Sequence, residues 1–573
     1  MFKKNSSHQQ PALISAASDL PEKQRKRLEN SWAATFYQEF FSRIDESAFS
    51  VLYSEIGSRP NVPVNVLISL EALKAGFGWS DQELYENYCY DLQVRYAVGY
   101  DRLGDGDFEI RSLYYFRERL SRYNAEKGIN LVEKAFEQIT DAQIVSLKIR
   151  TGMQRMDSTQ IASNIVSASR LQLLVEGIQR LERILSDADK TRLAETLAPY
   201  IKDDSGHYTY RVKGKQAVDE HLQAVGKTIH SLLQDLKPSY ATENAYHVLE
   251  RLFADNFNLL PEGTPHPKAN SEISSGCLQS VDDLEASYRS KGTGKYKGYV
   301  ANITETCDPE NEIQLITKVQ VAPNNTDDGQ LLAEALPNLK TRTDLDTLIT
   351  DGGFGSQVSD DALQAHQVTL IQTAIRGAQP TPDKFTLADF DIQQDGQNHP
   401  TALTCPQGQT VPVTAGRTTG WQARFDPAIC ATCPFQESGH CPTQPQKRDP
   451  RYLLNFTTPE IRTAKRRQNH RKHLGDSHNL RSAVEATVRS VKHPFPAGQL
   501  PVHGKFRITC LTIASAAAAN LRRIQRYHIA KTNPSKMARS SQKPDIAVAL
   551  FSFFLLAIRS LRSWLTSNSN FAY

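Results

Sequence analysis

Strand-like and helix-like segments alternate in a fixed order between residues 296 and 375, and this order is the strongest constraint on the fold. Two segments rich in β-branched residues, 296–307 and 314–323, are followed by a helical pattern at 325–339. A short apolar strand at 347–351 and a second helix–strand pair complete the series. Alternation of this kind predicts an α/β fold, in which helices cover the faces of a sheet.

Residues 144–165 predict the first strand of the same sheet. The segments 144–150 (IVSLKIR) and 155–165 (RMDSTQIASNI) both contain β-branched residues in extended patterns. Residues 166–280 show apolar stripes at helical spacing instead. The first strand is therefore expected to be separated from the later strands by a helical insertion.

The N-terminal region is expected to be a helical domain that covers residues 1–145. Ser80 and Glu83 form a capping-box pattern, which predicts that a helix starts at Asp81. The segment 110–123 (IRSLYYFRERLSRY) interleaves arginines with aromatic residues. That mixture suits a helix with a basic face toward DNA, or equally an ordinary amphipathic helix.

The remaining segments complete the expected domain organisation. Three segments are expected to form one α/β core: 146–165, 281–378 and 458–530. An irregular Cys-rich insertion occupies 379–457, and residues 531–573 resemble a linker followed by an apolar helix.

The composition fits a globular protein without export or membrane anchoring. Hydrophobic residues make up 39% of the 573 residues and charged residues 23%. The longest apolar run, Ile546–Ile558, is too short to span a bilayer, and the first residues lack the apolar stretch of a secretory signal. The cytoplasm is therefore the expected compartment, where cysteines are more often free thiols or metal ligands than disulfides.

Positive charge is concentrated late in the chain. Residues 446–531 carry eighteen Lys and Arg against four Asp and Glu, a net charge of +14, whereas the whole chain has a formal net charge of +4. Such a concentration is typical of a surface that binds nucleic-acid phosphates. The alternative is a solvated basic face, but the same segment also holds a candidate catalytic residue.

Three acidic residues are candidates for binding metal ions. Asp157 lies within the first predicted strand, and Asp351 ends a short apolar strand before two glycines that permit close approach of a ligand. Glu485 lies on a predicted helix and shares a face with three cations. In phosphoryl transfer, convergent carboxylates hold two divalent ions that activate the attacking oxygen and stabilise the leaving one. Taken singly, each acid also has an ordinary interpretation as a turn residue, a loop starter or a surface ion-pair partner.

The spacing around Glu485 resembles a signature of the insertion-sequence DDE transposases. Many members of that family carry the pattern Tyr-x2-Arg-x3-Glu-x6-Lys. This chain has His478, Arg481, Glu485 and Lys492 at the same spacing, with His in place of Tyr. A histidine in that position can still donate a hydrogen bond to phosphate, but its charge titrates near neutrality.

The resemblance extends over about residues 35–525, interrupted by the two insertions. The segment 44–84 resembles the helical domain that precedes the catalytic core in these enzymes. The segment 500–508 (LPVHGKFRI) resembles the basic turn that follows their Glu-bearing helix. The family likeness implies an RNase H-like mixed-sheet core, preceded by a domain that binds DNA or mediates dimerisation.

For function, the resemblance implies a bacterial transposase that cuts DNA at the ends of an insertion sequence. Asp157, Asp351 and Glu485 would be its catalytic residues and the ligands of two Mg²⁺ or Mn²⁺ ions. Water would nick the element's end, and the exposed 3′-OH would then attack target DNA. The implied partners are double-stranded DNA and a second copy of the chain, without a membrane, in the cytoplasm at the nucleoid. Eight basic residues are the expected DNA contacts: His478, Arg481, Arg489, Lys492, Lys505, Arg507, Arg111 and Arg117.

Two other functions would use the same residues. An RNase H-fold nuclease would hydrolyse DNA with the same acids but without strand transfer. A DNA-binding protein derived from a transposase would lack catalysis altogether. The presence of all three acids together with Arg481 and Lys492 argues against the second alternative.

Four cysteines in the Cys-rich insertion form a second candidate metal site. Cys430 and Cys433 have the Cys-x2-Cys spacing of a thiolate knuckle. Cys405 and Cys441 would complete a tetrahedral Zn²⁺ site, with His440 as an alternative ligand. The other interpretations are unligated thiols and, less favoured, an iron–sulfur cluster. A structural zinc ion would support an insertion that is expected to be rich in loops and poor in apolar core.

Overall fold

The computed structural model describes most of the first 532 residues. The described residues are 1–9, 17, 19–55, 59–100, 102, 104–165, 168–201, 206, 212–291, 294–375, 381, 383–416, 420–445, 450–473, 482–495 and 498–532. They fall into two compact units, 1–521 and the described part of 522–573. The apolar run Ile546–Ile558 lies outside the described residues. Within them, no helix combines the length and the hydropathy needed to cross a bilayer.

The N-terminal region is helical. Its α-helices are α1 (Glu22–Glu29), α2 (Trp32–Glu39), α3 (Val64–Phe77), α4 (Asp81–Tyr90), α5 (Leu92–Ala97), α6 (Arg111–Lys127) and α7 (Leu131–Leu147). The predicted capping box at the start of α4 is confirmed, since Ser80 and Glu83 each accept a hydrogen bond from the other's backbone N–H. Phe41, Phe49 and Phe116 are fully buried, so large aromatic rings fill the interior of this region.

The prediction of an extended segment at 144–150 is wrong. Residues 144–147 form the last turn of α7, which ends at Lys148 with a positive φ of 54°. Asn130 caps the start of this helix, and Phe136 and Ile139 belong to its buried stripe. β-branched residues at the end of a helix resemble a short strand in the sequence, and the packing of the preceding turns decides between the two.

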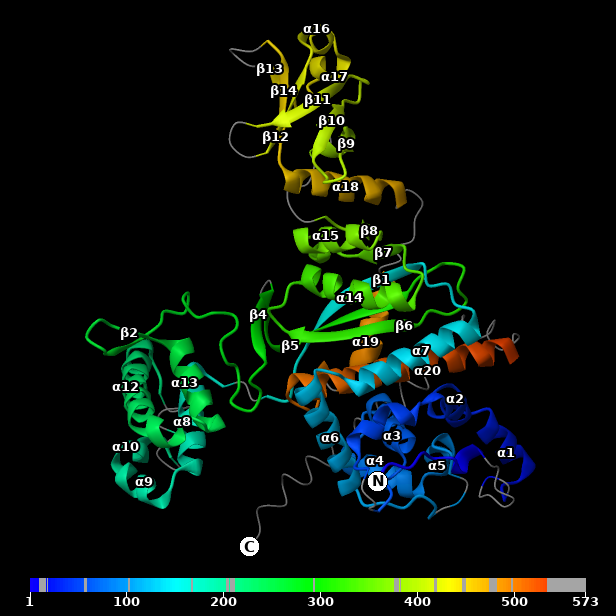
Figure 1. Cartoon of the computed structure of the whole chain (residues 1–573), viewed down its shortest axis with the longest axis vertical. Helices are drawn as coiled ribbons and strands as arrows, with labels where there is room; N and C mark the ends of the chain where they lie inside the picture. Colours follow the sequence, from blue (N-terminus) through cyan, green and yellow to red (C-terminus); the bar gives the residue numbers. More distant parts are fainter. Residues whose placement is uncertain are drawn as a thin grey trace. The chain divides into compact units, whose positions relative to one another are not determined.

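A six-stranded mixed sheet forms the α/β region (Figure 1). Its strands in chain order are β1 (Met153–Ile161), β4 (Ser287–Lys291), β5 (Gly294–Thr306), β6 (Ile316–Pro323), β7 (Thr347–Thr350) and β8 (Thr369–Gln372). They pair in the order β4-β5-β1-β7-β8, and β6 also pairs with β5. β5 is antiparallel to β1, β4 and β6, whereas β7 is parallel to both β1 and β8. The α/β fold expected from the alternation of segments is confirmed.

Helices cover both faces of this sheet. On one face, α14 (Asp328–Arg342) and α15 (Gln357–Ala365) form a core with Met156, Leu348 and Leu370. On the other face, α19 (Ser482–Lys492) packs against β1. Successive residues of a strand point to opposite faces, so Asp157, next to Met156, faces the layer that contains α19.

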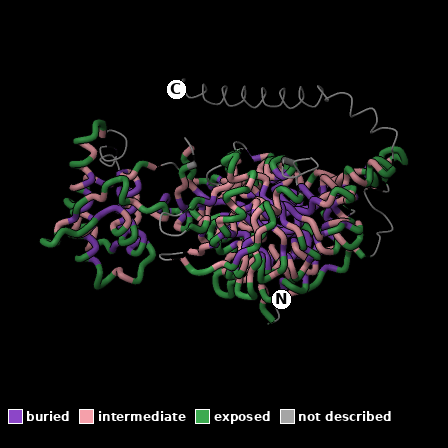
Figure 2. The backbone as a smooth tube through the Cα atoms, turned by 90° about the horizontal axis from the view of Figure 1, so that it is seen from above, coloured by how far each residue is buried: buried purple, intermediate pink, exposed green. Residues whose placement is uncertain are grey.

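The insertion after β1 is a helical bundle with its own core. Its helices are α8 (Arg170–Ile184), α9 (Asp187–Arg192), α10 (Ala194–Leu197), α12 (Lys215–Tyr240) and α13 (Asn244–Asn256), followed by the hairpin of β2 (Phe257–Leu259) and β3 (Pro265–Pro267). Leu174, Val225 and Leu249 are fully buried inside it. In Figure 2 buried stretches of backbone lie in the interior of this bundle. Gly226 lets α12 approach the hairpin, because a Cβ at this position would come within 2.4 Å of the Phe257 ring.

The Cys-rich insertion is more regular than its sequence predicts. Six antiparallel strands form its sheet in the order β13 (Gln444–Pro445), β14 (Tyr452–Phe456), β12 (Trp421–Phe425), β11 (Thr410–Ala415), β10 (Pro400–Thr404) and β9 (Asp391–Gln394). Phe390, Leu403 and Phe425 are buried at its centre. The expectation of a loop-rich insertion with little apolar core is therefore wrong. These strands are too short and too often interrupted by Gly and Pro to show a strand period in the sequence.

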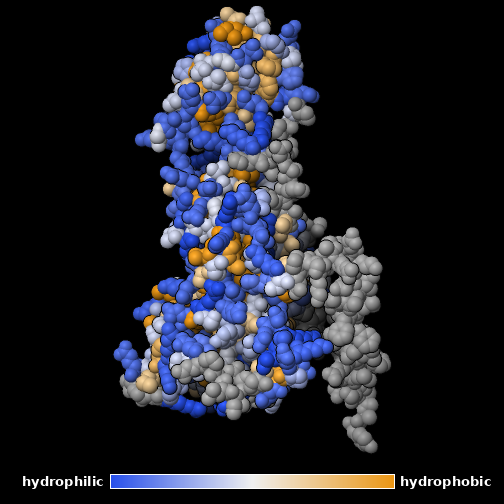
Figure 3. All heavy atoms as spheres, turned by 90° about the vertical axis from the view of Figure 1, so that its right-hand side faces the viewer, coloured by the Kyte–Doolittle hydropathy of each residue, from blue (hydrophilic) through white to orange (hydrophobic). Residues whose placement is uncertain are grey.

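Two further helices complete the described fold, α18 (Thr458–His473) and α20 (Lys505–Thr532). α18 lies along the edge strand β8. There Asn469 donates a hydrogen bond to the carbonyl of Leu370 at 3.2 Å, and His470 Nδ1 donates to the carbonyl of Gln372 at 2.6 Å. These side chains satisfy carbonyl groups that an uncovered edge would expose. Hydrophilic residues predominate on the face shown in Figure 3, with apolar patches between them.

Candidate active site

Asp157 and Asp351 lie on neighbouring parallel segments. The parallel pairing of β1 with β7 ends at Arg155 and Ile349, and Asp351 directly follows β7. If the register continued for two more residues, Asp157 would lie beside Asp351. Level residues on adjacent strands point to the same face, with Cα atoms about 5 Å apart. The continued register would direct two of the three candidate carboxylates to the face that α19 covers.

Hydrogen bonds to the neighbouring backbone orient both aspartates. Asp157 is 8% exposed, and its Oδ1 accepts from the N–H of Ser158 at 3.0 Å. Asp351 caps the short turn η6 (Gly352–Phe354), where its Oδ1 accepts from the N–H of Gly353 at 2.7 Å. The side-chain amide of Gln372 donates to the main-chain carbonyl of Asp351 at 3.0 Å. Local bonds of this type restrict the orientation of a carboxylate before any ligand binds.

Glu485 lies on α19, the helix that packs against β1. Val484, Thr487 and Val491 of this helix are buried, whereas Glu485 is exposed. Since each residue turns an α-helix by about 100°, Glu485 lies on the flank of the buried stripe. The third acid is therefore carried on the helix next to the strand of Asp157, with its side chain at the surface.

The chemistry of these donors suits a hard divalent cation, because Mg²⁺ prefers carboxylate oxygens. Across the described ranges, however, no three His, Cys, Asp or Glu side chains are arranged so that they could hold a metal ion. If the register of β1 and β7 continues to Asp157 and Asp351, the side chain of Glu485 would have to turn inward from the flank of α19 to join them. Residues 474–481, which precede α19, lie outside the described part of the chain.

The basic residues predicted to bind DNA in the C-terminal third lie on two helices. Arg489 and Lys492 are on α19, and Lys505 and Arg507 begin α20. Arg489 and Arg507 are exposed. Burial lowers the pKa of Lys492, which is half-buried. The remaining two residues of the signature, His478 and Arg481, lie outside the described residues.

The two arginines predicted on α6 differ in their surroundings. Arg111 begins the helix and is exposed. Arg117 donates from Nε to Glu71 at 2.7 Å and from its terminal nitrogens to Asp81 at 2.8 and 2.7 Å. Burial alone would lower the pKa of Arg117, but these carboxylates raise it above its ordinary value. Arg117 therefore neutralises acids within the protein, and its geometry does not support the predicted contact with DNA.

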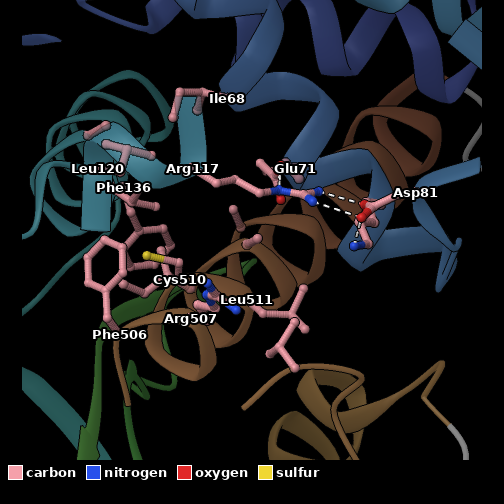
Figure 4. Close-up of a pocket in the computed structure, with 18 of the residues that line it drawn as sticks. Ile68, Glu71, Asp81, Arg117, Leu120, Phe136, Phe506, Arg507, Cys510 and Leu511 are labelled. Carbon is pink, nitrogen blue, oxygen red and sulfur yellow. Dashed lines mark hydrogen bonds and ion pairs between the residues drawn. The ribbon is translucent and has the colours of Figure 1, made fainter. Parts of the chain in front are cut away.

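The same ion pairs border a cavity of about 400 Å³ between α3, α6, α7 and α20 (Figure 4). Phe136, Phe506 and Leu511 contribute to its mainly apolar wall, while Arg117 and Asp81 lie at its edge. None of the three candidate carboxylates is among the described residues that line it. The cavity is therefore distinct from the candidate active site.

The ion pairs of Asp81 predict a stability that depends on pH. Burial alone would raise its pKa, but hydrogen bonds and charges from Arg117 and Lys74 lower it to about 2. A carboxyl group whose pKa is lowered in the folded state stabilises that state above its unfolded pKa, and this stabilisation is lost as pH falls from about 4 to 2. Asp81→Asn is therefore expected to reduce the free energy of unfolding at pH 7 by roughly 1–2 kcal/mol.

Urea-induced unfolding at pH 7 and pH 3, followed by helical circular dichroism, measures this effect. The difference between the wild-type protein and Asp81→Asn should shrink at pH 3, because this carboxyl group is then mostly protonated in the unfolded chain. Glu118→Gln is a suitable control, because Glu118 is 60% exposed in its pair with Arg122 and such pairs contribute little. An equal loss at both pH values would contradict the prediction.

The structure places the four cysteines of the predicted zinc site near one another. Each of them is half-buried. Burial raises the pKa of Cys430 to about 11, and the thiols of Cys441, Cys405 and Cys433 contribute to this rise. In the Cys-x2-Cys pair, the backbone N–H of Cys433 donates to the carbonyl of Cys430 at 3.2 Å. The thiols are thus neighbours, although they are not arranged as ligands of a metal ion in the residues that the structure describes.

Sequence reasoning missed a polar cluster buried beneath α19. Arg155 Nε donates to Glu305 Oε1 at 2.6 Å, and the Thr487 hydroxyl lies 2.8 Å from both oxygens of Glu305. The Glu305 side chain is 0% exposed. The sequence does contain a signal for this cluster, because a Glu within the apolar strand pattern of 296–307 must find partners if it is buried.

The mixed sheet thus carries Asp157 and Asp351, and the neighbouring helix α19 carries Glu485 together with Arg489 and Lys492. Residues 404–525 match the family model described as a transposase DDE domain. The chain therefore carries a DDE transposase domain, the class that its sequence resembles. The matched region contains Glu485 and the four cysteines, whereas Asp157 and Asp351 precede it. No curated protein and no solved structure gives a significant match.

Proposed function

We propose that the chain is a bacterial insertion-sequence transposase, which cleaves DNA at the ends of its element and joins the 3′-OH to target DNA. The observation that carries this proposal is the parallel pairing of β1, which bears Asp157, with β7, which Asp351 directly follows, next to the helix that bears Glu485. The match to a transposase DDE domain supports the same assignment. The substrate would be double-stranded DNA, and the pairing of two DNA ends would require a homodimer.

We assign the mixed sheet to an RNase H-like core. In the run β6-β5-β1, the central strand β5 is antiparallel to both of its neighbours. The sheet continues from β1 into β7 and β8, which run parallel to β1. In the DDE transposases the first Asp lies on the first strand, the second follows the fourth strand, and the Glu lies on a later helix. If the short edge strand β4 is left out of the count, β7 is the fourth strand of the sheet. Asp157 then corresponds to the first acid, Asp351 to the second and Glu485 to the third.

In this proposal Asp157 and Asp351, joined by Glu485 once its side chain turns inward, would hold Mg²⁺ or Mn²⁺. When bound, two such ions would activate the attacking oxygen and neutralise charge on the phosphoryl group. In the first step, the oxygen of water bonds to phosphorus and the bond to the 3′ oxygen breaks, which leaves a 5′-phosphate and a 3′-OH. In the second step, that 3′-OH bonds to a phosphorus of the target strand and displaces the target's own 3′ oxygen. No covalent bond between protein and DNA is required.

The basic residues would hold the DNA during these steps. Arg489 and Lys492 lie one and two turns beyond Glu485 on α19, so that phosphates beside the scissile bond are within their reach. Contacts to the DNA backbone fix its register on the protein without reading its sequence. The further contacts that we propose are His478, Arg481, Lys505, Arg507 and Arg111.

We also propose a structural Zn²⁺ ion in the Cys-rich domain, with Cys405, Cys430, Cys433 and Cys441 as ligands. Four thiolates are a common ligand set for structural zinc. The contribution of the Cys441, Cys405 and Cys433 thiols to the raised pKa of Cys430 supports this proposal. On binding, the four sulfur atoms would close into a tetrahedron and fix the loops that carry α16 (Pro427–Cys430) and α17 (Pro434–Glu437).

Strand transfer is the decisive test, because a simple nuclease would cut DNA with the same acids. The purified protein is incubated with Mg²⁺, supercoiled plasmid and a labelled duplex that ends in the inverted repeat flanking the gene. We expect covalently joined plasmid and duplex, and no joining when the duplex ends in a 3′-dideoxynucleotide. Cutting without joining would indicate a nuclease, and binding without either reaction would indicate a non-catalytic DNA-binding protein.

A further inference from the structure

The buried cluster of Arg155, Glu305 and Thr487 connects the elements that carry two of the candidate catalytic acids. Arg155 lies on β1, two residues before Asp157. Thr487 lies on α19, two residues after Glu485. Glu305 lies on β5, directly opposite Arg155 in the antiparallel pair. The Glu305 carboxylate therefore connects β1, which bears Asp157, with α19, which bears Glu485.

The hydrogen bonds that Glu305 accepts from Arg155 and Thr487 are short and shielded from water. The side chains of Arg155 and Glu305 are 7% and 0% exposed, and Thr487 is 1% exposed. Arg155 Nε lies 2.6 Å from Glu305 Oε1, and the Thr487 hydroxyl is 2.8 Å from each oxygen of Glu305. Buried hydrogen bonds to a charged group are strong and directional, and leaving one unmade is costly.

The apolar contacts of α19 are less directional. Val484 and Val491 bury apolar side chains above the sheet, and apolar contacts alone permit small rotations and shifts of a helix. The hydrogen bond from Thr487 to Glu305 fixes the rotation of α19 about its axis and its position along that axis, because the bond forms at only one such arrangement. The negative charge of Glu305 also balances Arg155, a cation on the same face of β1 as Asp157.

We infer that Arg155, Glu305 and Thr487 form a clamp that positions Glu485 relative to Asp157. These three are positioning residues, since they act on the catalytic acids through the backbone of β1 and α19. The inference rests on the proposed function, because it assigns the clamp to the same active site. A shift of α19 by about 1 Å would misplace Glu485 and cost roughly 100-fold in the rate of cleavage.

Thr487→Val tests the clamp with the smallest change of shape, because it replaces one hydroxyl with a methyl group. Thr487→Ser keeps the hydroxyl and serves as the conservative rescue. Thr512→Val is the matched control: Thr512 is also 1% exposed and helical, but its hydroxyl donates to the carbonyl of Ile508 at 2.7 Å within α20. Glu305→Gln is less suitable on its own, since it leaves Arg155 buried without its counter-charge and endangers folding.

Two measurements on the full chain separate positioning from general stability. The first is hydrogen exchange of the α19 amides, residues 482–492, which does not depend on activity. The second is the cleavage rate as a function of Mg²⁺ concentration on a duplex element end. For Thr487→Val we expect at least about tenfold faster exchange in α19, a cleavage rate lowered by roughly 10- to 100-fold and a higher Mg²⁺ requirement. Thr487→Ser and Thr512→Val should remain within about threefold of the wild-type protein.

The outcomes distinguish a failure of the clamp from a failure of the proposed function. Equal exchange in α19 for Thr487→Val and Thr512→Val would overturn the clamp, whatever the activity. Faster exchange in α19 without any change in the cleavage rate or in its Mg²⁺ dependence would overturn the positioning role. If the wild-type protein does not cleave DNA, the proposed function is wrong, and so is the role of the clamp in positioning catalytic acids. The exchange experiment still reports whether Thr487 holds α19 in place.

Discussion

Asp157→Asn and Asp351→Asn are each expected to lower the rate of Mg²⁺-dependent DNA cleavage by roughly 10³-fold or more, with binding of the element end retained. Asn has the shape of Asp but lacks the negative charge that attracts a divalent cation. Losing several kcal/mol of charge stabilisation in the transition state corresponds to this change in rate. The measurement is single-turnover cleavage of a labelled end, combined with a binding titration under the same conditions.

Asp346→Asn is the matched control for both variants. Asp346 immediately precedes β7, whereas Asp351 immediately follows it, so the two aspartates lie at opposite ends of one strand. Asp346 is exposed, and we expect its variant to cleave at nearly the wild-type rate. Unfolding curves for all three variants should overlap within about 1 kcal/mol, because charge and not packing is changed. Substantial cleavage by Asp157→Asn or Asp351→Asn would remove that residue from the active site.

Glu485→Gln tests whether the exposed third acid joins the two aspartates during cleavage. Glu485 is exposed on the flank of α19, so its loss should leave stability within about 0.5 kcal/mol of the wild-type value. If its side chain turns inward to join the aspartates, cleavage should fall as steeply as in the aspartate variants. If cleavage persists at the wild-type rate, another residue must complete the metal site.

Much of the α/β fold could be predicted from the sequence because its segments follow clear periods. The strands that contain Asp157 and Asp351 and the helix of Glu485 were each recognisable from local patterns of apolar residues. The parallel pairing of β1 with β7 was not, because register depends on contacts between segments almost 200 residues apart in the chain. The sequence identified the three candidate acids, but it could not show that the segments of Asp157 and Asp351 are neighbours in the sheet.

The errors have physical causes that are specific to each segment. The last turn of α7 contains β-branched residues, and burial of Phe136 and Ile139 in the preceding turns overrides their preference for strands. Arg117 looked like a cation for DNA because the partners that neutralise it, Glu71 and Asp81, are 46 and 36 residues away in the sequence. Long-range ion pairs of this kind leave no local pattern, so they were found only in the structure.

The zinc proposal leads to the second large expected effect. Cys433→Ser and Cys441→Ser should each lower the zinc content from about one ion per chain toward zero, because a serine hydroxyl is a poor substitute for a thiolate. These two positions are preferable to Cys405 and Cys430, which also pack against the apolar core of the β9–β14 sheet. Because that core is already well formed, we expect the domain to lose several kcal/mol, less than the roughly 10–16 kcal/mol that zinc supplies to zinc-finger peptides.

Metal analysis of protein purified without chelators, together with limited proteolysis, measures both parts of this prediction. The loops around α16 and α17 should become sites of early cleavage in the variants, whereas the sheet with Phe390, Leu403 and Phe425 at its centre should resist longer. Cys277→Ser is the control, because Cys277 is half-buried outside this domain and accepts a hydrogen bond from Gln279. Equal zinc content in Cys433→Ser, Cys441→Ser and Cys277→Ser would show that the four thiols do not bind zinc. Their proximity would then reflect packing alone, and the β9–β14 sheet would be stabilised by its apolar core.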